Sequence, residues 1–268
     1  MAKIKVGIAG CLGRMGQELT KQILEDKNFI LVGGFEHKAH PHIGKKISEV
    51  TDLKSNTIIA NNASSVFKIA DVVIDFSTPQ ATLSNVKIAS ITKKALVIGT
   101  TGITKAQKNK IKSFSKKIPI LMSSNMSIGI NLLFDLVKQA ASSLGRSEYD
   151  IEIAETHHKH KVDAPSGTAL SLGEYAAAGR KTTLDKTKIL DRTKNLNKRK
   201  DGDIGFSVAR GGEIAGEHTV SFISKHDRVD LIHKANNRSI FVTGALKGAI
   251  FVSKKKFGYF EMKDLLKI

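Results

Sequence analysis

The first part of the chain alternates between short apolar runs and segments with apolar residues every three or four positions. Residues 3–9 form a run rich in β-branched side chains, and residues 14–25 have helical spacing of their apolar positions. Residues 29–35 again have the composition of a strand. We therefore predict a strand, a glycine loop at residues 10–16, a helix and a second strand, in that order.

The same alternation continues further along the chain. Strands are expected at residues 71–76, 95–99 and 118–122, with helices at residues 80–90 and 105–116. Runs that are apolar throughout are typical of parallel strands buried on both faces. Strands that alternate with helices predict an α/β fold with a Rossmann-type doubly wound sheet.

The pattern changes near residue 128. A long helix carrying an apolar face at residues 133–144 is followed by an expected strand at 149–156 and an expected helix at 167–178. Three strand-like segments then follow at residues 204–210, 218–224 and 228–233, and a last helix is expected at residues 239–254. This order predicts an α+β domain with an open mixed sheet.

Residues 181–203 differ from their surroundings, because they are polar and charged and contain few apolar side chains. We predict an irregular excursion or a mobile loop there.

Composition limits the class of protein. The 268 residues leave room for two cores, and 41% hydrophobic with 25% charged residues is ordinary for a globular chain. No apolar run approaches the ~18 residues of a membrane span. Cys11 is the only cysteine, so disulfides within the chain are excluded, and the first residues lack the layout of a signal peptide. We expect a cytoplasmic protein without a membrane partner.

The formal net charge of +18 raises the possibility of a nucleic-acid partner. However, the lysines are spread along the chain, with one dense stretch at residues 181–200, and a lysine-rich genome would give the same picture. A basic surface alone is a weak signal. We predict no nucleic-acid partner and a more modest use of the charge, the attraction of an anionic substrate and cofactor.

The glycine loop GIAGCLGRMG is the first candidate site. Gly10, Gly13 and Gly16 lie between the first strand and the first helix, where glycine permits a tight turn and a close approach to a pyrophosphate. Glu36 ends the second strand about 20 residues later, where a carboxylate can accept hydrogen bonds from ribose hydroxyls. The spacing G-x-x-G-x-x-G is not the commonest fingerprint, and a structural turn is the alternative. The context favours a dinucleotide cofactor.

Two further turns follow expected strands at the edge where such sheets bind ligands. They are Gly99-Thr100-Thr101-Gly102 and Ser124-Asn125-Met126-Ser127. Each alone is equally compatible with a plain turn. Cys11 has no second cysteine to work with, and we interpret it as a small loop residue rather than a nucleophile.

The segment ETHHKHKVDAPSGTAL, residues 155–170, is the sharpest signal in the sequence. Three histidines and two lysines fall within residues 157–161. His158 and His160 have a spacing that zinc ligands on a strand can use, but no cysteine or carboxylate partner stands at an obvious spacing, so we predict no metal. A solvated basic loop is the other alternative, and it does not explain the residues that follow.

Those residues predict a helix start beside the basic cluster. Pro165 restricts the chain, Ser166 or Gly167 opens a helix, and Thr168 lies in its first turn. Free N–H groups at a helix start attract anions. Proton donors beside such a start suit a substrate that carries carboxylates and must be both held and protonated.

The stretch HHKHKVDAPSGTA resembles the signature of the dihydrodipicolinate reductases, also called 4-hydroxy-tetrahydrodipicolinate reductases. The resemblance covers nearly the whole chain through GIAGCLGRMG, DFSTP, GTTG, SSNMSIGIN, ARGGEIAGEHTVSF and HKANNRSIFVTGAL. The long signature is highly specific, whereas the glycine loop is not. The stretch KHDRVDL diverges from the family but carries none of its functional positions.

This resemblance implies a domain organisation and a reaction. Residues 1–126 and 239–268 are expected to form a dinucleotide-binding domain, and residues 127–238 a substrate-binding and tetramerisation domain. The implied reaction is the NAD(P)H-dependent reduction of 4-hydroxy-tetrahydrodipicolinate, with loss of water, to tetrahydrodipicolinate in lysine and diaminopimelate biosynthesis. A homotetramer acting on a small dicarboxylate is implied as well. The alternative enzyme is a reductase of the same fold class acting on another small acid.

The resemblance also implies site residues. His157 and Lys161 would be catalytic, and His158, Gly167 and Thr168 would bind the substrate. The cofactor would be bound by Gly10, Cys11, Leu12, Gly13, Arg14, Met15, Glu36, His37, Gly99, Thr100, Thr101, Ser124, Asn125, Met126 and Ser127.

His37 stands where some family members carry arginine, which leaves the choice between NADH and NADPH open. Glu36 would repel a 2′-phosphate, whereas Lys38 and a protonated His37 would offset that repulsion. We expect NADH to be used well and NADPH at least as a weaker alternative.

Overall fold

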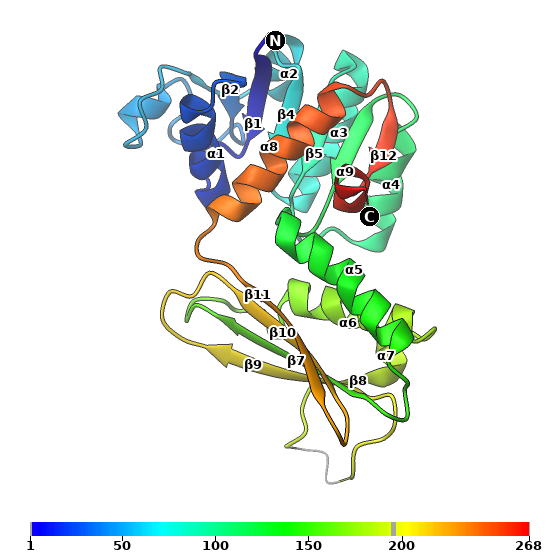
Figure 1. Ribbon diagram of the computed structural model, residues 1–268. Helices are drawn as coiled ribbons and strands as arrows, with labels where there is room; N and C mark the ends of the chain where they lie inside the picture. The colour runs from blue at the N-terminus through cyan, green and yellow to red at the C-terminus, as the bar shows by residue number, and fades with distance from the viewer. Residues whose placement is uncertain (1, 194–196, 268) are drawn as a thin grey trace. The chain divides into compact units, whose positions relative to one another are not determined.

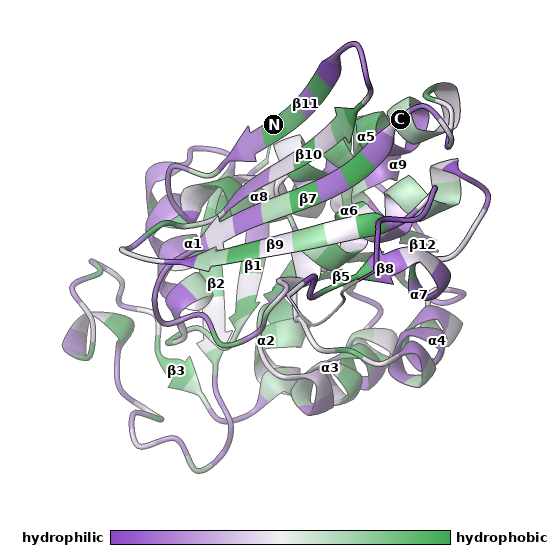
Figure 2. Ribbon diagram, turned by 90° about the horizontal axis from the view of Figure 1, so that it is seen from below, coloured by the Kyte–Doolittle hydropathy of each residue, from purple (hydrophilic) through white to green (hydrophobic). Residues whose placement is uncertain are grey.

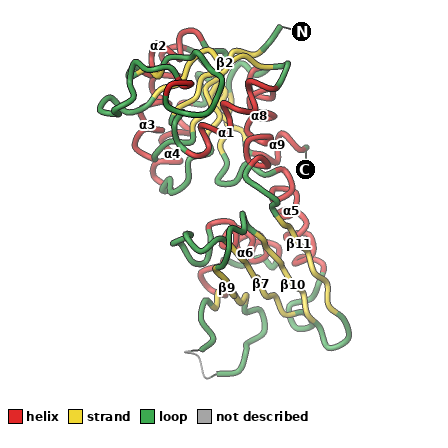
Figure 3. Tube along the Cα trace, turned by 90° about the vertical axis from the view of Figure 1, so that its left-hand side faces the viewer, coloured by secondary structure: helices red, strands yellow, loops and turns green. Residues whose placement is uncertain are grey.

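The computed structural model describes residues 2–193 and 197–267, and the chain divides into two compact units (Figure 1). The first unit combines Met1–Met126 with Ser239–Lys267, and the second consists of Ser127–Arg238. Each unit contains a sheet of its own (Figure 3). The chain therefore leaves the first unit once and returns to complete it.

A parallel seven-stranded sheet forms the centre of the first unit. Its strands are β1 (Ile4–Ala9), β2 (Phe29–Phe35), β3 (Ile59–Ala60), β4 (Val72–Asp75), β5 (Ala95–Ile98), β6 (Pro119–Met122) and β12 (Gly258–Phe260), in the order β12-β6-β5-β4-β1-β2-β3. Every described pair in this sheet is parallel. The prediction of a doubly wound α/β sheet is confirmed.

Helices cover both faces of this sheet, as the uniformly apolar strands require. They are α1 (Arg14–Glu25), the 3₁₀ turn η1 (Ile47–Glu49), α2 (Ala63–Ile69), α3 (Pro79–Thr92), α4 (Lys105–Phe114), α8 (Ser239–Ser253) and α9 (Met262–Leu266). Helices α2, α3 and α4 share one core cluster with Leu96 and Ile98 of β5, while α8 lies against Val97 of the same strand (Figure 1). Alternate residues of β5 thus point to opposite helix layers.

The second unit contains a five-stranded mixed sheet in the order β11-β10-β7-β9-β8. Its elements are α5 (Ile128–Ser143), β7 (Asp150–His157), α6 (Gly167–Gly179), α7 (Leu184–Thr187), β8 (Lys188–Ile189), β9 (Ile204–Arg210), β10 (Glu217–Ile223) and β11 (Arg228–Lys234). Strand β10 is antiparallel to β7 and β11, whereas β9 is parallel to β7 and β8. The predicted open mixed sheet is confirmed.

Helices α5 and α6 pack against each other and share a core with the sheet strands. The residues that fill this core alternate along β7 and β10, for example Ile151 and Ile153, or Val220 and Phe222. Figure 2 shows hydrophobic and hydrophilic positions alternating along these strands. One face of the sheet is therefore buried by helices and carries the apolar set.

The prediction of an irregular segment at residues 181–203 is wrong in part. It contains α7 and β8, and β8 pairs with β9. Ion pairs also fasten the segment, since Arg192 and Arg199 both bind the carboxylate of Glu152 on β7. Charged side chains thus replace the apolar anchors that the sequence lacks there. Residues 194–196 of the dense lysine stretch lie outside the described residues.

Outside residues 181–203, five short elements were not predicted from the sequence: η1, β3, α2, β12 and α9. No helix in the described part of the chain is long and apolar enough to cross a membrane.

Candidate active site

The glycine loop connects β1 to α1 at the edge of the first sheet. Gly10 has φ +74°, a left-handed conformation that glycine adopts without steric cost. A Cβ on Gly16 would lie 2.1 Å from the carbonyl oxygen of Gly10, so only glycine lets α1 start this close to the loop. Gly13 is the N-cap of α1, and no side chain caps the helix there. The first N–H groups of α1 can therefore serve an anion.

A pocket of about 940 Å³ opens beside this loop. Gly10, Gly13, Glu36 and His37 line it together, and Lys38 lies next to them. Glu36 accepts a hydrogen bond from the backbone N–H of Leu12 at 2.8 Å, so the acid at the end of β2 is tied to the glycine loop. The structure brings these predicted cofactor residues into one place.

Other predicted cofactor residues do not line this pocket. The turn Gly99–Thr101 follows β5, and the turn Ser124–Met126 follows the neighbouring strand β6. Thr100 is buried, and its hydroxyl oxygen accepts a hydrogen bond from the hydroxyl of Thr82 at 2.9 Å, which holds the turn in place. Ser127 belongs to the second unit, where it caps α5 by accepting a hydrogen bond from the N–H of Ile130.

The side chain of Cys11 is fully buried, in contact range of Gly34. Burial, and next the negative charge of Glu36, raises the pKa of its thiol to about 12. The thiol is therefore protonated at neutral pH and is no nucleophile. Leu12 and Met15 are half-buried, whereas Arg14 is exposed.

Other residues that line the pocket were not predicted. They include Ser77 and Asn85, which both bond to the buried carboxylate of Asp75 at the end of β4. Burial raises the pKa of Asp75, while the hydrogen bonds from Asn85 and Ser77 lower it by less. Asp75 and Ser77 belong to the motif DFSTP. The periodicity of the strand does not reveal which of its side chains face the glycine loop.

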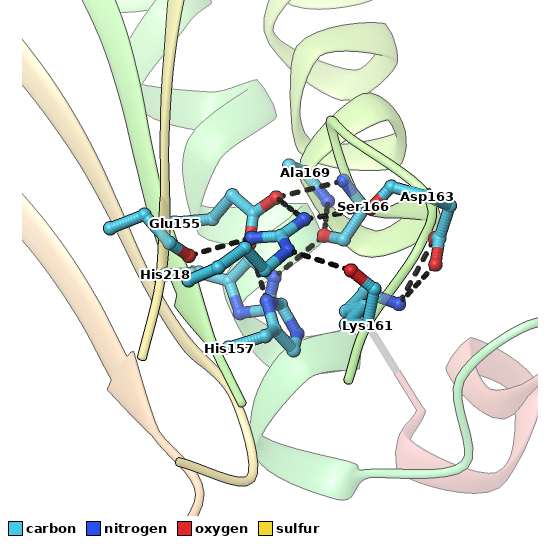
Figure 4. A network of polar contacts seen from close by, with 9 residues as sticks. Glu155, His157, Lys161, Asp163, Ser166, Ala169 and His218 are labelled. Atoms are coloured by element: carbon cyan, nitrogen blue, oxygen red, sulfur yellow. Dashed lines mark hydrogen bonds and ion pairs between the residues drawn. The ribbon is translucent and has the colours of Figure 1, made fainter. Parts of the chain in front are cut away.

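In the second unit, the histidine–lysine cluster begins at the end of β7. His157 is 8% exposed and lies on the helix-covered face of the sheet, two residues beyond Glu155 on the same face. Its Nδ1 contacts a carboxylate oxygen of Glu155 (Figure 4). His218 of β10 approaches with its ring at 77° to that of His157 and 5.1 Å away.

Glu155 is the most heavily bonded carboxylate of this region. One oxygen accepts from the backbone N–H of Ser166 and from Arg210, both at 2.9 Å, and the other accepts from Arg210 at 3.0 Å and from His157. Burial raises the pKa of Glu155, but these hydrogen bonds, first that of Arg210, outweigh burial and hold the pKa below its usual range. Glu155 is therefore ionised at neutral pH.

His157 is neutral at the same pH. Burial lowers its pKa, the positive charges of Lys161 and Arg210 lower it further, and Glu155 opposes them without reversing the shift. The network assigns the proton of the neutral ring to Nδ1, which donates to Glu155. Nε2 is then an unprotonated acceptor. A side chain on Gly216 would lie 2.9 Å from this Nε2, so glycine at that position leaves the nitrogen uncovered.

Burial lowers the pKa of His218 to about 3, with the neighbouring His157 as the next cause. Its Nε2 lies 3.2 Å from the hydroxyl of Ser166, the residue that caps α6. His218 thus stays neutral and links β10 to the start of α6.

Lys161 forms an ion pair within its own loop. Its Nζ lies 2.8 Å and 3.0 Å from the two carboxylate oxygens of Asp163. Burial raises the pKa of Asp163, but Lys161 and then the backbone N–H of Gly167 lower it by more. An aspartate of the protein therefore contacts both Lys161, which was predicted to be catalytic, and the N–H of Gly167, which was predicted to bind the substrate. Gly167 is exposed with open space around its Cα, and Thr168 is half-buried.

His158 and His160 differ from His157. Burial, followed by the positive charge of Arg238, lowers the pKa of His158. His160 is exposed and lies 3.8 Å from a carboxylate oxygen of Glu213. Among residues 2–193 and 197–267, no group of three histidine, cysteine, aspartate or glutamate side chains is arranged to hold a metal ion.

Glu155, Arg210, His218 and Arg238 were missed as members of this site. Glu155 carried a usable signal, because it stands two residues before His157 on a predicted strand and must share its face. Arg210 and His218 reach the cluster through strand pairing that the sequence pattern does not specify, and Arg238 lies between β11 and α8.

Two family models match the chain. The model described as dihydrodipicolinate reductase, N-terminus, matches residues 4–126, and the one described as dihydrodipicolinate reductase, C-terminus, matches residues 129–266.

Full-length relatives carry a consistent name. The 4-hydroxy-tetrahydrodipicolinate reductase of Parvibaculum lavamentivorans is 44% identical over 269 residues, covering 100% of this chain and 99% of the relative. That of Bradyrhizobium diazoefficiens is 42% identical over 267 residues, covering 99% of this chain and 98% of the relative.

Among solved structures, a dipicolinate-bound dihydrodipicolinate reductase from Paenisporosarcina sp. TG-14 is 25% identical with a TM-score of 0.77. The match covers 98% of this chain and 99% of that one. A DAP dehydrogenase of C. glutamicum, 14% identical with a TM-score of 0.55, covers 98% of this chain and 93% of its own and shares the fold.

Proposed function

The chain belongs to the dihydrodipicolinate reductase family, and from that premise we propose that it reduces 4-hydroxy-tetrahydrodipicolinate to tetrahydrodipicolinate. The reaction uses NADH or NADPH, releases water, and belongs to lysine and diaminopimelate biosynthesis. Within the structure, this proposal rests on the cluster of His157 and Lys161 beside the start of α6.

The first unit suits a nicotinamide dinucleotide. Gly10, Gly13 and Gly16 keep the loop free of side chains, and any Cβ on Gly16 would collide with the backbone of Gly10. The uncapped N–H groups of α1 would hold the pyrophosphate, and Glu36 would accept from the ribose hydroxyls. When bound, the cofactor supplies the hydride. NADH is the better fit, because Glu36 disfavours a 2′-phosphate, while His37 and Lys38 keep NADPH usable.

The second unit suits a dicarboxylate that must be protonated. We assign the carboxylates to His158, the N–H groups of Gly167 and Thr168, and the guanidinium of Arg238, whose charge already reaches His158. A substrate carboxylate at Gly167 replaces Asp163 as the partner of Lys161, so the lysine keeps an anionic neighbour when the substrate binds. Arg238 was not among the residues assigned from the sequence.

Lys161 and His157 handle the proton. Lys161 can donate a proton to the substrate, and the open Nε2 of His157 can take up and pass on a proton. Glu155 stabilises the charge that His157 gains when it is protonated.

The test is a coupled assay in which dihydrodipicolinate synthase makes the substrate from pyruvate and aspartate semialdehyde. We expect NADH oxidation that requires both the synthase and this protein, with tetrahydrodipicolinate as the product. Lys161→Ala is the matched negative control. Cofactor oxidation with some other small acid, and none in the coupled assay, would point instead to a different reductase of the same fold.

We further expect a homotetramer in the cytoplasm. The five-stranded sheet of the second unit supports the assembly, because Ile232 is exposed on its strand β11.

A further inference from the structure

We propose that Glu155 and Arg210 are positioning residues for this reaction: together they fix the strand that carries His157 and the loop that carries Lys161 in one arrangement. The inference rests on the proposed function and adds two residues that the sequence did not single out.

All N–H donors of the Arg210 guanidinium form hydrogen bonds within this cluster. Two of its N–H groups donate to the two carboxylate oxygens of Glu155, at 2.9 Å and 3.0 Å. The others donate to backbone carbonyls, those of Ala209 at 2.7 Å, Asp163 at 2.7 Å and Lys161 at 3.3 Å. A guanidinium has five N–H donors, and each of them has an acceptor here.

Two of these acceptors belong to the loop between β7 and α6. The carbonyls of Lys161 and Asp163 flank Val162, whose side chain is 95% exposed and contributes no packing. Apolar contacts therefore do not hold this part of the loop. The backbone that presents Lys161 is held by a guanidinium that is itself fixed to the sheet, where Arg210 pairs with His157 across β9 and β7.

Glu155 is the common partner. Its carboxylate contacts His157 directly, binds Arg210 with both oxygens, and accepts from the N–H of Ser166 at the start of α6. Strand, loop and helix thus meet at one buried carboxylate that is 3% exposed (Figure 4). Displacing it would move His157, Lys161 and the proposed carboxylate-binding turn together.

Stability alone does not account for this pair. A buried ion pair loses so much solvation that well-packed apolar side chains of similar volume are often equally stable or more stable. Apolar contacts are not directional, so apolar side chains could not orient the ring of His157 or form hydrogen bonds with two carbonyls of an exposed loop. Misplacing a reacting group by about 1 Å can cost on the order of 10²-fold in rate.

The charged groups around His157 shift its pKa, so a change in these groups can be measured as a change in the pH dependence of activity. Glu155 on β7 raises its pKa, whereas Lys161 in the loop and Arg210 on β9 lower it, and neutral His218 on β10 completes its surroundings. Glu155→Gln removes the one group that favours the protonated ring. The pKa of His157 then falls further, so with rising pH the ring loses its ability to take up and pass on a proton at a lower pH than in the wild type.

The experiment compares Arg210→Lys, Arg210→Ala and Glu155→Gln with the wild type. Arg192→Lys is the matched control, because Arg192 also binds a glutamate of β7, Glu152, at 2.5 Å. We expect the first three variants to lower kcat by on the order of 10²-fold, with unchanged NADH affinity. Glu155→Gln should also shift the alkaline limb of the kcat profile to lower pH, and millimolar guanidinium should restore part of the kcat of Arg210→Ala. The control should keep the wild-type kcat.

Near-normal kcat with an unshifted pH profile in folded variants would overturn the proposal. Unfolding of all three variants at the assay temperature would overturn it too, since the pair would then be structural. The proposed function fails separately, if the wild type does not oxidise NADH in the coupled assay.

Discussion

Lys161 and His160 are adjacent in sequence but have different surroundings. The ammonium group of Lys161 is bound by Asp163 and its loop is held by Arg210, whereas His160 is exposed and has only Glu213 at 3.8 Å. We expect Lys161→Ala and His157→Ala each to lower kcat by roughly 10²–10⁴-fold, the usual scale for a lost general acid or base. NADH affinity, measured by fluorescence titration, should stay unchanged, because the cofactor pocket is formed by residues of the first unit.

His160→Ala is the internal control and should keep near-normal kcat. The assignment of the cluster is wrong if Lys161→Ala and His157→Ala also keep it, or if they lose it only by unfolding.

His218 makes the stability depend on pH. Its pKa is about 3 in the folded protein and near 6.5 when exposed, so the unfolded chain binds the proton more readily. Its contribution is complete above about pH 6.5 and is lost as the pH falls toward 3, at about 1.4 kcal/mol per pH unit. Between pH 7 and pH 5 we expect His218 to remove about 2 kcal/mol of unfolding free energy.

His218→Gln keeps a polar partner for Ser166 without titrating. Thermal unfolding at pH 7 and pH 5 should therefore show a smaller loss in this variant than in the wild type. An equal loss in both proteins would mean that His218 does not titrate as its burial implies.

The sequence pattern predicted His157 and Lys161 but not the residues that hold them. Their chemistry is visible because histidine and lysine are dense in one short segment. Arg210 and His218 lie about 50 residues further along, and they reach the cluster only through the pairing of β9 and β10 with β7. Register of this kind depends on tertiary packing, which no local pattern encodes.

The start of α1 requires a residue without a Cβ at the position of Gly16. A Cβ at Gly16 would meet the carbonyl oxygen of Gly10 at 2.1 Å, and that backbone atom cannot move aside cheaply. We expect Gly16→Ala to destabilise the protein by about 1–3 kcal/mol and to weaken NADH binding, both measurable by thermal shift with and without NADH. Gly13→Ala, whose Cβ would lie 3.3 Å from the same oxygen, should be milder in stability. Equal effects of the two changes would contradict this account of the loop.

We expect the end of β2 to control which nicotinamide cofactor is used. Glu36, His37 and Lys38 line the pocket together. We expect Glu36→Ala to lower the preference for NADH over NADPH by roughly tenfold, because both an acceptor for the ribose hydroxyls and a charge that repels phosphate are lost. Comparing kcat/KM for the two cofactors measures this.

Glu49→Ala removes the same charge from η1, outside the pocket, and should leave the preference unchanged. If the wild type prefers NADPH by more than a hundredfold, the interpretation of Glu36 is wrong.

Long elements were predicted well and short ones were missed. Strands β2 and β9 have the predicted bounds, and α5, α6 and α8 end within a residue or two of expectation. Their apolar periodicity extends over enough positions to be distinctive. Strand β3 has two residues and β12 has three, so no period can be recognised in them, and both depend on a neighbouring strand for their definition.

The assembly of the whole protein is expected to use the face of the second sheet that no helix covers. Leu231 of β11 packs into the core under the helices, so the next residue, Ile232, points the other way and is 54% exposed. We expect sedimentation at micromolar concentration to give about four times the 29.1 kDa of one chain. Ile232→Asp should yield smaller species, because a charge would be buried in the interface.

Ile91→Asp is the matched control, since Ile91 is 81% exposed on α3 of the first unit and should tolerate the charge. A monomeric wild type would contradict the expected tetramer.

The return of the chain to the first unit has a consequence for its synthesis on the ribosome. Helix α8 buries Val242, Ala245 and Ala249 in that unit, yet it is translated only after the whole second unit. At roughly 5–20 residues per second, residues 127–238 delay its arrival by roughly 5–20 s. During that time the sheet strand β5 exposes the apolar face that includes Val97, against which α8 later packs. We therefore expect the nascent chain to bind chaperones that recognise apolar surfaces, although the finished protein buries that face.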